Sequence, residues 1–147
     1  MSHSDKSVKL TLAAVKVLGV MFCVLMVVFP FIFKPFFTEI GLEKTFTVFI
    51  ITFYACCPCA AVTLFCLNKL LMNVKNGIIF NSANIKLLKS LSISCFAASL
   101  ISVPICFFMP IMLVFPLEAL FMALILHVVK NVIEKGSEIK NENDLTI

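Results

Sequence analysis

The sequence predicts an all-α fold: an integral membrane four-helix bundle with up-down topology and both termini in the cytoplasm. Hydrophobic residues make up 61% of the 147 residues and charged residues only 14%, and the mean hydropathy is +1.10. Ordinary soluble domains carry about a quarter charged residues, so this chain has more apolar surface than a soluble fold of its length can bury. Four long apolar stretches, separated by polar segments or by proline, give the number of helices.

The first two apolar stretches predict helices over residues 10–33 and 45–76. Lysines precede the first stretch, as in a signal peptide, but the stretch is long and no small-residue cleavage site follows it. An uncleaved transmembrane helix that ends at Pro30 and Lys34 is therefore favoured. The second stretch holds an uncharged run that, at ~1.5 Å per residue, exceeds the ~30 Å hydrocarbon core. Pro58 in its middle predicts a kink.

A polar hinge over residues 76–82 leads into a third predicted helix over residues 82–108, and a fourth is predicted over residues 111–135. Gly77 suits the left-handed position that ends a helix, and Asn81 or Ser82 suits the N-cap of the next one. Gly136 is expected to stop the fourth helix, and a polar tail over residues 136–147 follows. The chain, residues 1–147, is thus predicted to be a single transmembrane domain.

Lysines indicate the orientation of the helices. They gather around the start of the first helix, on both sides of the hinge and around the end of the fourth helix, whereas the other two loops are neutral or uncharged. The positive-inside rule then places the hinge and both termini in the cytoplasm. The lipid bilayer is the predicted partner of the four helices. The net charge of +4 is explained by this topology, so direct binding of nucleic acid is not predicted.

Small residues recur at every fourth position of the third helix, which places them along one face. They are Ser90, Ser94, Ala98, Ser102 and Cys106. Such a stripe lets a neighbouring helix approach closely, although a chance run in a helix rich in serine and alanine is the alternative.

Glu118 is the only acidic residue in the apolar blocks of the predicted spans, the fourth of which ends at Val129. A carboxylate in hydrocarbon is costly, so this group must be protonated, paired or in contact with water. Counting along the helices places Thr52, Tyr54, Ser99 and Ser102 at a similar depth. We expect a protonated Glu118 inside the bundle, hydrogen-bonded by Tyr54 or a neighbouring hydroxyl, with proton or ion movement as the alternative.

All seven cysteines fall inside apolar stretches, which indicates buried thiols. Cys57 and Cys59 flank Pro58, as the thiolates that bind soft cations do in metal-transporting ATPases, but no nucleotide-binding domain accompanies them, and no metal is predicted. Cys56 and Cys59 also form a C-x-x-C pair, as in quinone-linked thiol oxidases, yet no exchange partner lies in the outer loop. No catalytic residue and no cofactor is predicted, because the short polar loops leave no space for an enzyme site.

Two segments resemble a bacterial family of four-helix membrane proteins known as domain of unknown function 2975. The first is Gly77-x-x-Phe80-x-x-x-Asn84 in the hinge, and the second is the ending Gly136-x-x-x-Lys140-x-Glu142-x-Asp144-Leu145-Thr146-Ile147. The resemblance implies a four-span layout in the bacterial cytoplasmic membrane and no established activity. Members of the family are often encoded beside a small helix-turn-helix regulator of the Cro type.

Two functional classes follow from these observations. In the first, the protein is a non-catalytic regulator or adaptor whose cytoplasmic hinge and C-terminal tail bind a protein partner, such as a small helix-turn-helix regulator. In the second, it is a small transporter or channel that moves protons, ions or a small solute through Glu118, or less plausibly a metal through Cys57 and Cys59.

Overall fold

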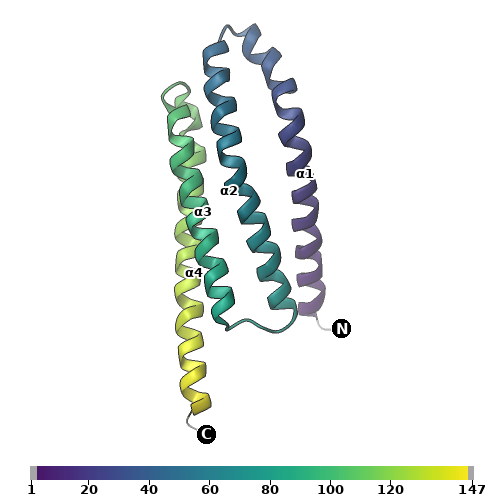
Figure 1. Ribbon diagram of the computed structural model, residues 1–147, viewed down its shortest axis with the longest axis vertical. Coiled ribbons are helices and arrows are strands. Elements are labelled where there is room, and N and C mark those ends of the chain that lie inside the picture. Colours follow the sequence, from purple (N-terminus) through teal and green to yellow (C-terminus); the bar gives the residue numbers. More distant parts are fainter. Residues whose placement is uncertain (1–2, 146–147) are drawn as a thin grey trace.

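The computed structural model describes residues 3–145, without the side chains of residues 3–7, 141, 144 and 145. This part of the chain is helical and contains no strand. Its elements are α1 (His3–Glu39), α2 (Glu43–Lys75), α3 (Ser82–Cys106), the short 3₁₀ helix η1 (Pro110–Leu113) and α4 (Val114–Leu145) (Figure 1). Four helices are long and apolar enough to cross a membrane. The predicted all-α class with four such helices is confirmed.

The four helices lie side by side in chain order and run alternately up and down (Figure 1). α1 packs against α2, α2 against α3, and α3 against α4, whereas α1 does not pack against α4 anywhere in the described range. The arrangement is therefore open between its first and last helices. The start of α1, the hinge and the end of α4 lie at one end of the molecule, which we call the hinge end.

α1 does not end at Pro30 and Lys34 as predicted, because the helix runs through Pro30 and Pro35 to Glu39. Each proline removes one backbone donor without breaking the helix. The helix ends where Gly41 adopts a φ of +72°, and the amides of Gly41 and Leu42 donate to the carbonyls of Thr38 and Phe37. This is the Schellman arrangement that ends helices at glycine.

The predicted end of the fourth helix at Gly136 is also wrong, because α4 continues through this glycine to Leu145. Gly136 is not among the glycines with positive φ, which in the described chain are Gly41 and Gly77. The segment expected to be a polar tail is thus helical as far as Leu145, and Thr146 and Ile147 lie outside the described residues. The bounds predicted for the second and third helices agree with α2 and α3 within two residues.

Few side chains are buried within this arrangement. The largest buried cluster lies toward the hinge end, where Cys66 of α2 meets Leu88 and Leu91 of α3. In the other half, phenylalanines join α1 to α2, and the rings of Phe29 and Phe53 stack with their centroids 4.0 Å apart. Large apolar side chains remain exposed along all four helices, as expected for helices that lipid surrounds.

Candidate functional site

At the start of the hinge, backbone hydrogen bonds cap the end of α2. Gly77 has a φ of +74°, its amide donates to the Val74 carbonyl at 3.0 Å, and the Ile78 amide donates to the Asn73 carbonyl at 2.9 Å. This is a second Schellman ending. A residue with a side chain would be strained at Gly77, so the glycine fixes the direction in which the hinge leaves α2.

Asn84, on the first turn of α3, holds the hinge in place. Its side chain is 1% exposed. The amide nitrogen donates to the carbonyls of Ile78 at 2.7 Å and Ile79 at 2.9 Å, and the amide oxygen accepts from Asn73 Nδ2 at 2.6 Å. One buried side chain thus satisfies two loop carbonyls and ties the end of α2 to the start of α3, which leaves the hinge little freedom to rearrange.

The N-cap of α3 is Asn81, one of the two candidates from the sequence. Its side-chain oxygen accepts from the Ala83 amide at 3.3 Å and from the Ser82 hydroxyl at 3.2 Å. This satisfies one of the free amides at the start of the helix.

Phe80 of the hinge lies against Gly136 of α4. A Cβ atom placed on Gly136 would lie 2.6 Å from Phe80 Cε1, closer than two carbon atoms can approach. Gly136 therefore serves to make room for the ring. The contact brings the hinge motif and the start of the predicted tail motif together, although they are far apart in the sequence.

Apolar side chains of the hinge face outward among lysines. Ile78, Ile79 and Phe80 are each between 43% and 47% exposed, and we call these three residues the hinge patch. Lys75 and Lys86, before and after the hinge, are exposed as well. Exposed apolar groups on a polar end of a molecule are typical of a contact surface.

The remaining tail residues are only partly described. Glu142 is exposed on the last turns of α4, and it takes part in an interaction within the chain. Asp144 and Leu145 belong to the same helix, but their side chains are outside the description, as are Thr146 and Ile147 altogether.

The polar cluster expected around Glu118 does not form. Tyr54 donates its hydroxyl to the Met26 carbonyl of α1 at 2.9 Å, and Ser99 donates to the Pro116 carbonyl of α4 at 2.8 Å. Glu118 itself is exposed, so the expectation that it lies inside the bundle beside Tyr54 is wrong. The depth of Glu118 along α4 does not fix the direction of its side chain, and the rotation of α4 turns this side chain outward.

The other two members of that expected cluster also have local roles. Ser102 donates to the Ser99 carbonyl one turn earlier at 2.9 Å. Thr52 and Ser102 line the same small cavity between the helices, and Glu118 does not border it.

Part of the small-residue stripe on α3 lies against α2. Ser94 is buried and donates to the Cys59 carbonyl at 2.7 Å, and it accepts from the Thr63 hydroxyl at 3.3 Å. The Cys56 thiol approaches the Ala98 carbonyl at 3.9 Å. Ser102 and Cys106 are half-buried, whereas Ser90 at the start of the stripe is exposed.

Serines on the opposite side of α3 bind α4, and this was not foreseen. Ser92 donates to the Ala123 carbonyl at 2.8 Å, alongside the bond from Ser99 to Pro116. α3 therefore joins its two neighbours through hydroxyl groups that reach backbone carbonyls. The signal in the sequence was the presence of serines on both faces of an apolar helix, since polar side chains commonly join helices in a membrane.

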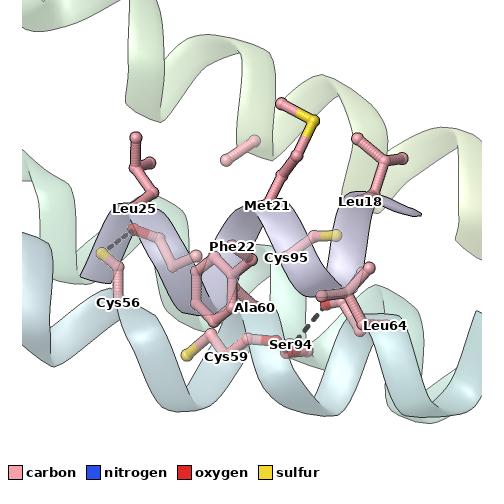
Figure 2. Close-up of a pocket in the computed structure, with 13 residues that line it drawn as sticks. Leu18, Met21, Phe22, Leu25, Cys56, Cys59, Ala60, Leu64, Ser94 and Cys95 are labelled. Carbon is pink, nitrogen blue, oxygen red and sulfur yellow. Dashed lines mark hydrogen bonds between the residues drawn. The ribbon is translucent and has the colours of Figure 1, made fainter. Parts of the chain in front are cut away.

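A groove of about 490 Å³ lies where α1, α2 and α3 meet, with one residue of α4, Ala119, at its edge. Its lining is almost wholly apolar and includes Cys56, Cys59 and Cys95, which Figure 2 shows spread along the groove rather than gathered at one point. Within the described residues no set of three potential metal ligands forms a site. Cys57 is buried and donates to the Phe53 carbonyl of its own helix at 3.3 Å.

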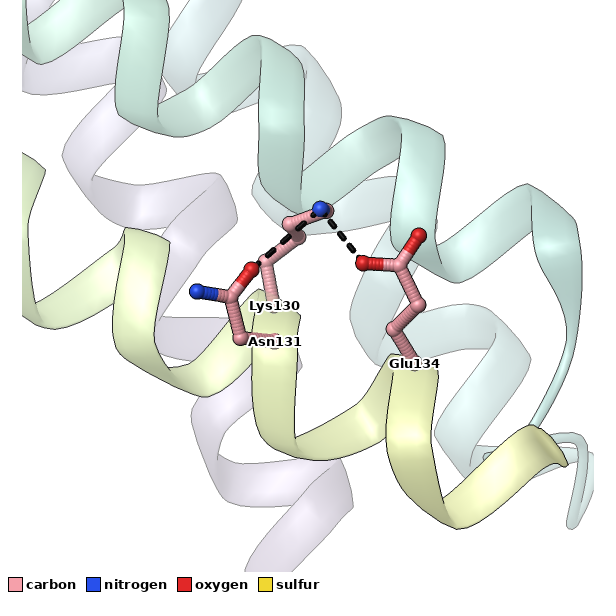
Figure 3. A network of polar contacts seen from close by, with 3 residues as sticks. All are labelled: Lys130, Asn131 and Glu134. Atoms are coloured by element: carbon pink, nitrogen blue, oxygen red, sulfur yellow. Dashed lines mark hydrogen bonds and ion pairs between the residues drawn. The ribbon is translucent and has the colours of Figure 1, made fainter. Parts of the chain in front are cut away.

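Toward the hinge end, α4 carries a small charged network. Lys130 Nζ lies 2.6 Å from Glu134 Oε2 and donates to Asn131 Oδ1 at 3.3 Å (Figure 3). The three residues lie on one helix, so the pair stabilises α4 by only a few tenths of a kcal/mol, ~0.3–0.5. We regard the network as part of the helix surface and not as a binding site.

Comparison with known protein families identifies the family to which the chain belongs. The family model described as a protein of unknown function (DUF2975) matches residues 2–147. The chain belongs to the DUF2975 family. No curated protein and no solved structure matches it.

The resemblance that the hinge and tail motifs suggested is thus confirmed over essentially the whole chain. In this DUF2975 member, Gly77 ends α2, Asn84 binds the hinge carbonyls, and Phe80 lies on Gly136. The four positions form one connected structure at the hinge end. No catalytic family or fold is indicated for the chain.

Proposed function

We propose that this DUF2975 member is a multi-pass protein of the bacterial cytoplasmic membrane that acts as a non-catalytic regulator or adaptor. Its four helices anchor the protein, and its cytoplasmic hinge and the end of α4 bind a protein partner. The lysines near the start of α1, on both sides of the hinge and near the end of α4 support this orientation through the positive-inside rule.

The observation that carries the proposal is the fixed, outward-facing hinge patch. Asn84 binds the carbonyls of Ile78 and Ile79, and this leaves their side chains exposed. A loop that is already ordered loses little conformational freedom when it binds, which favours recognition. On α4, Ile139 is 60% exposed one turn beyond Gly136, the residue against which Phe80 lies.

The partner should present an apolar group bordered by acidic residues, since Lys75 and Lys86 flank the hinge patch. A small helix-turn-helix regulator encoded beside a DUF2975 protein is the candidate that we propose to test. A membrane anchor that holds such a regulator would control how much of it is free in the cytoplasm.

The test is a titration of the purified regulator onto the full chain in lipid nanodiscs. Replacing Ile78 and Ile79 by serine, or deleting residues 144–147, should weaken binding about tenfold or more. Ile40→Ser is the matched control, because Ile40 is 54% exposed in the loop at the opposite end of the molecule. Equal binding by all variants would contradict the proposal, as would binding lost equally in the control.

The transporter alternative has no observation in its favour. Glu118 borders neither the groove between α1, α2 and α3 nor the cavity that Thr52 and Ser102 line. The role of this residue is better explained by an interaction outside the chain.

A further inference from the structure

Glu118 is a carboxyl group without a partner on the outer face of an apolar helix. It is exposed, and among residues 3–145 no hydrogen bond or ion pair joins it to the rest of the chain. No other acidic residue lies in the uncharged parts of the four stretches, since Glu134 comes after the fourth apolar block ends at Val129. Contacts within the single chain therefore do not explain why an acidic residue stands at this position.

Hydrogen bonds between the helices show the depth of this residue. Ser99 binds the Pro116 carbonyl, Cys56 approaches the carbonyl of Ala98, and Tyr54 binds Met26. These contacts place Glu118 of α4 level with the middle of the apolar stretches of α1, α2 and α3. In a membrane this level is the centre of the hydrocarbon, where an unpaired carboxyl group is most costly.

Tyr54 and Ser99 are not free to bind Glu118, and Thr52 lines a cavity that Glu118 does not border. The Tyr54 hydroxyl donates to Met26, and the Ser99 hydroxyl donates to Pro116. No lysine lies at the same depth, since Lys130 is three turns of α4 away and is paired with Glu134. A partner for Glu118 must therefore come from outside the chain.

The helix face around Glu118 is a continuous exposed apolar stripe. Its members recur at helical spacing, three or four residues apart, and are between 40% and 64% exposed: Val114, Phe115, Phe121, Met122, Ile125, Val129 and Val132. A face of this kind with one polar residue at its centre is typical of helices that associate within a membrane, where the polar group fixes the contact.

We propose that this face of α4 binds the same face of a second copy of the chain, with the two Glu118 side chains hydrogen-bonded to each other. The proposal rests on the membrane insertion proposed above. A protonated carboxyl group has one donor and a free acceptor, so two such groups can each donate to the other. The contact gives each carboxyl group a hydrogen-bond donor and an acceptor without any further residue.

Symmetry is the reason to choose a second copy as the occupant. A two-fold axis along the membrane normal places the same residue of both copies at the same depth, and an isologous contact brings that residue to its own equivalent near the axis. The symmetry of the dimer thus places the Glu118 carboxyl group of one copy at the same membrane depth as that of the other copy. A different partner would have to present a donor at mid-membrane depth.

Photo-crosslinking of the full chain in membranes tests the contact directly. With p-benzoylphenylalanine in place of Phe121, which is 64% exposed one turn from Glu118, irradiation should give a crosslinked dimer. The matched control is the same replacement at Phe65 of α2, which is 68% exposed and should give none. A dimer from position 65 alone, or a crosslink from position 121 only to another protein, would overturn the proposal.

Energy transfer between labelled copies in liposomes measures the strength of the contact. Glu118→Leu removes the reciprocal hydrogen bonds and should raise the dimer dissociation constant about tenfold or more. Glu118→Gln keeps a donor and an acceptor in place and should stay within about threefold of the unchanged protein. A constant that Glu118→Leu does not change, or an unchanged protein that is monomeric at all lipid ratios, would overturn the proposal.

Alkaline carbonate extraction of the same membranes separates this proposal from the one on which it rests. Protein that resists extraction but does not dimerise contradicts only the contact through Glu118. Extraction of the protein by carbonate would contradict membrane insertion, and it would also contradict the contact through Glu118, which depends on insertion.

Discussion

The hydroxyl of Tyr54 on α2 donates a hydrogen bond of 2.9 Å to the backbone carbonyl of Met26 on α1. In a regular helix the amide of residue 30 would donate to this carbonyl, but residue 30 is proline and has no amide hydrogen. Tyr54 therefore supplies the donor that Pro30 lacks. This bond and the stacked rings of Phe29 and Phe53 join α1 to α2, and within the described part of the chain α1 packs against no other helix.

Tyr54→Phe should lower the free energy of unfolding by about 1–3 kcal/mol, because the Met26 carbonyl is left without a partner in apolar surroundings. The measurement is reversible unfolding in mixed micelles. Pro30→Ala restores the missing backbone amide, so in that background Tyr54→Phe should cost clearly less. Equal costs in the two backgrounds would contradict this account.

Gly136→Ala should destabilise the protein even though alanine forms helices better than glycine. The new methyl group would meet the Phe80 ring, so the ring must leave its place on α4. With Phe80→Ala present the space is free, and Gly136→Ala should then stabilise the helix by about 0.5–1 kcal/mol. Thermal unfolding of the four proteins gives the comparison, and a stabilising Gly136→Ala in the presence of Phe80 would refute the contact.

The sequence predicted those features that depend on local chemistry. The four apolar helices follow from composition and length, and Gly77 and Asn81 act through bonds to residues within five positions. Gly136 was misjudged because its reason lies in Phe80, a residue distant in the chain. A glycine that makes room for a ring and a glycine that ends a helix look the same in a sequence.

At the candidate site, too, local features could be predicted from the sequence, whereas features that depend on distant residues could not. The family resemblance marks Asn84 and Phe80, but their roles depend on contacts that exist only in the folded hinge. The depth of Glu118 could be counted along the chain, but the direction of its side chain depends on how α4 rotates against α3. That rotation is fixed by contacts such as those from Ser92 and Ser99, which no spacing rule specified.

Asn84→Asp should loosen the hinge while keeping the shape of the side chain. The carboxylate can still accept, but it cannot donate to the carbonyls of Ile78 and Ile79. We expect faster hydrogen exchange at the Ile78 and Gly77 amides and faster proteolysis between residues 76 and 82. Asn131→Asp is the control, since Asn131 is exposed on α4, and equal exchange in both variants would argue against the role of Asn84.

Ser94→Ala should weaken the packing of α3 on α2, because Ser94 is buried and binds both the Cys59 carbonyl and the Thr63 hydroxyl. The expected loss is about 0.6 kcal/mol and at most about 1.7 kcal/mol, the average and the maximum for hydrogen bonds between helices in membranes. Ser90→Ala is a matched control, because Ser90 belongs to the same stripe but is exposed. Unfolding in mixed micelles measures both variants, and an equal effect would contradict a specific role for Ser94.

Orientation in the membrane can be tested with the two glycine loops. The hinge and the loop containing Gly41 lie at opposite ends of the molecule, so they should face opposite sides of the membrane (Figure 1). A cysteine introduced at Ile40 should react with an impermeant maleimide in intact cells, whereas one at Asn76 should react only after the cells are opened. The native cysteines all lie within the apolar stretches, so the unchanged protein serves as the background. Labelling of position 76 in intact cells would reverse the predicted orientation and place the hinge patch outside the cytoplasm, where it could not bind a cytoplasmic regulator.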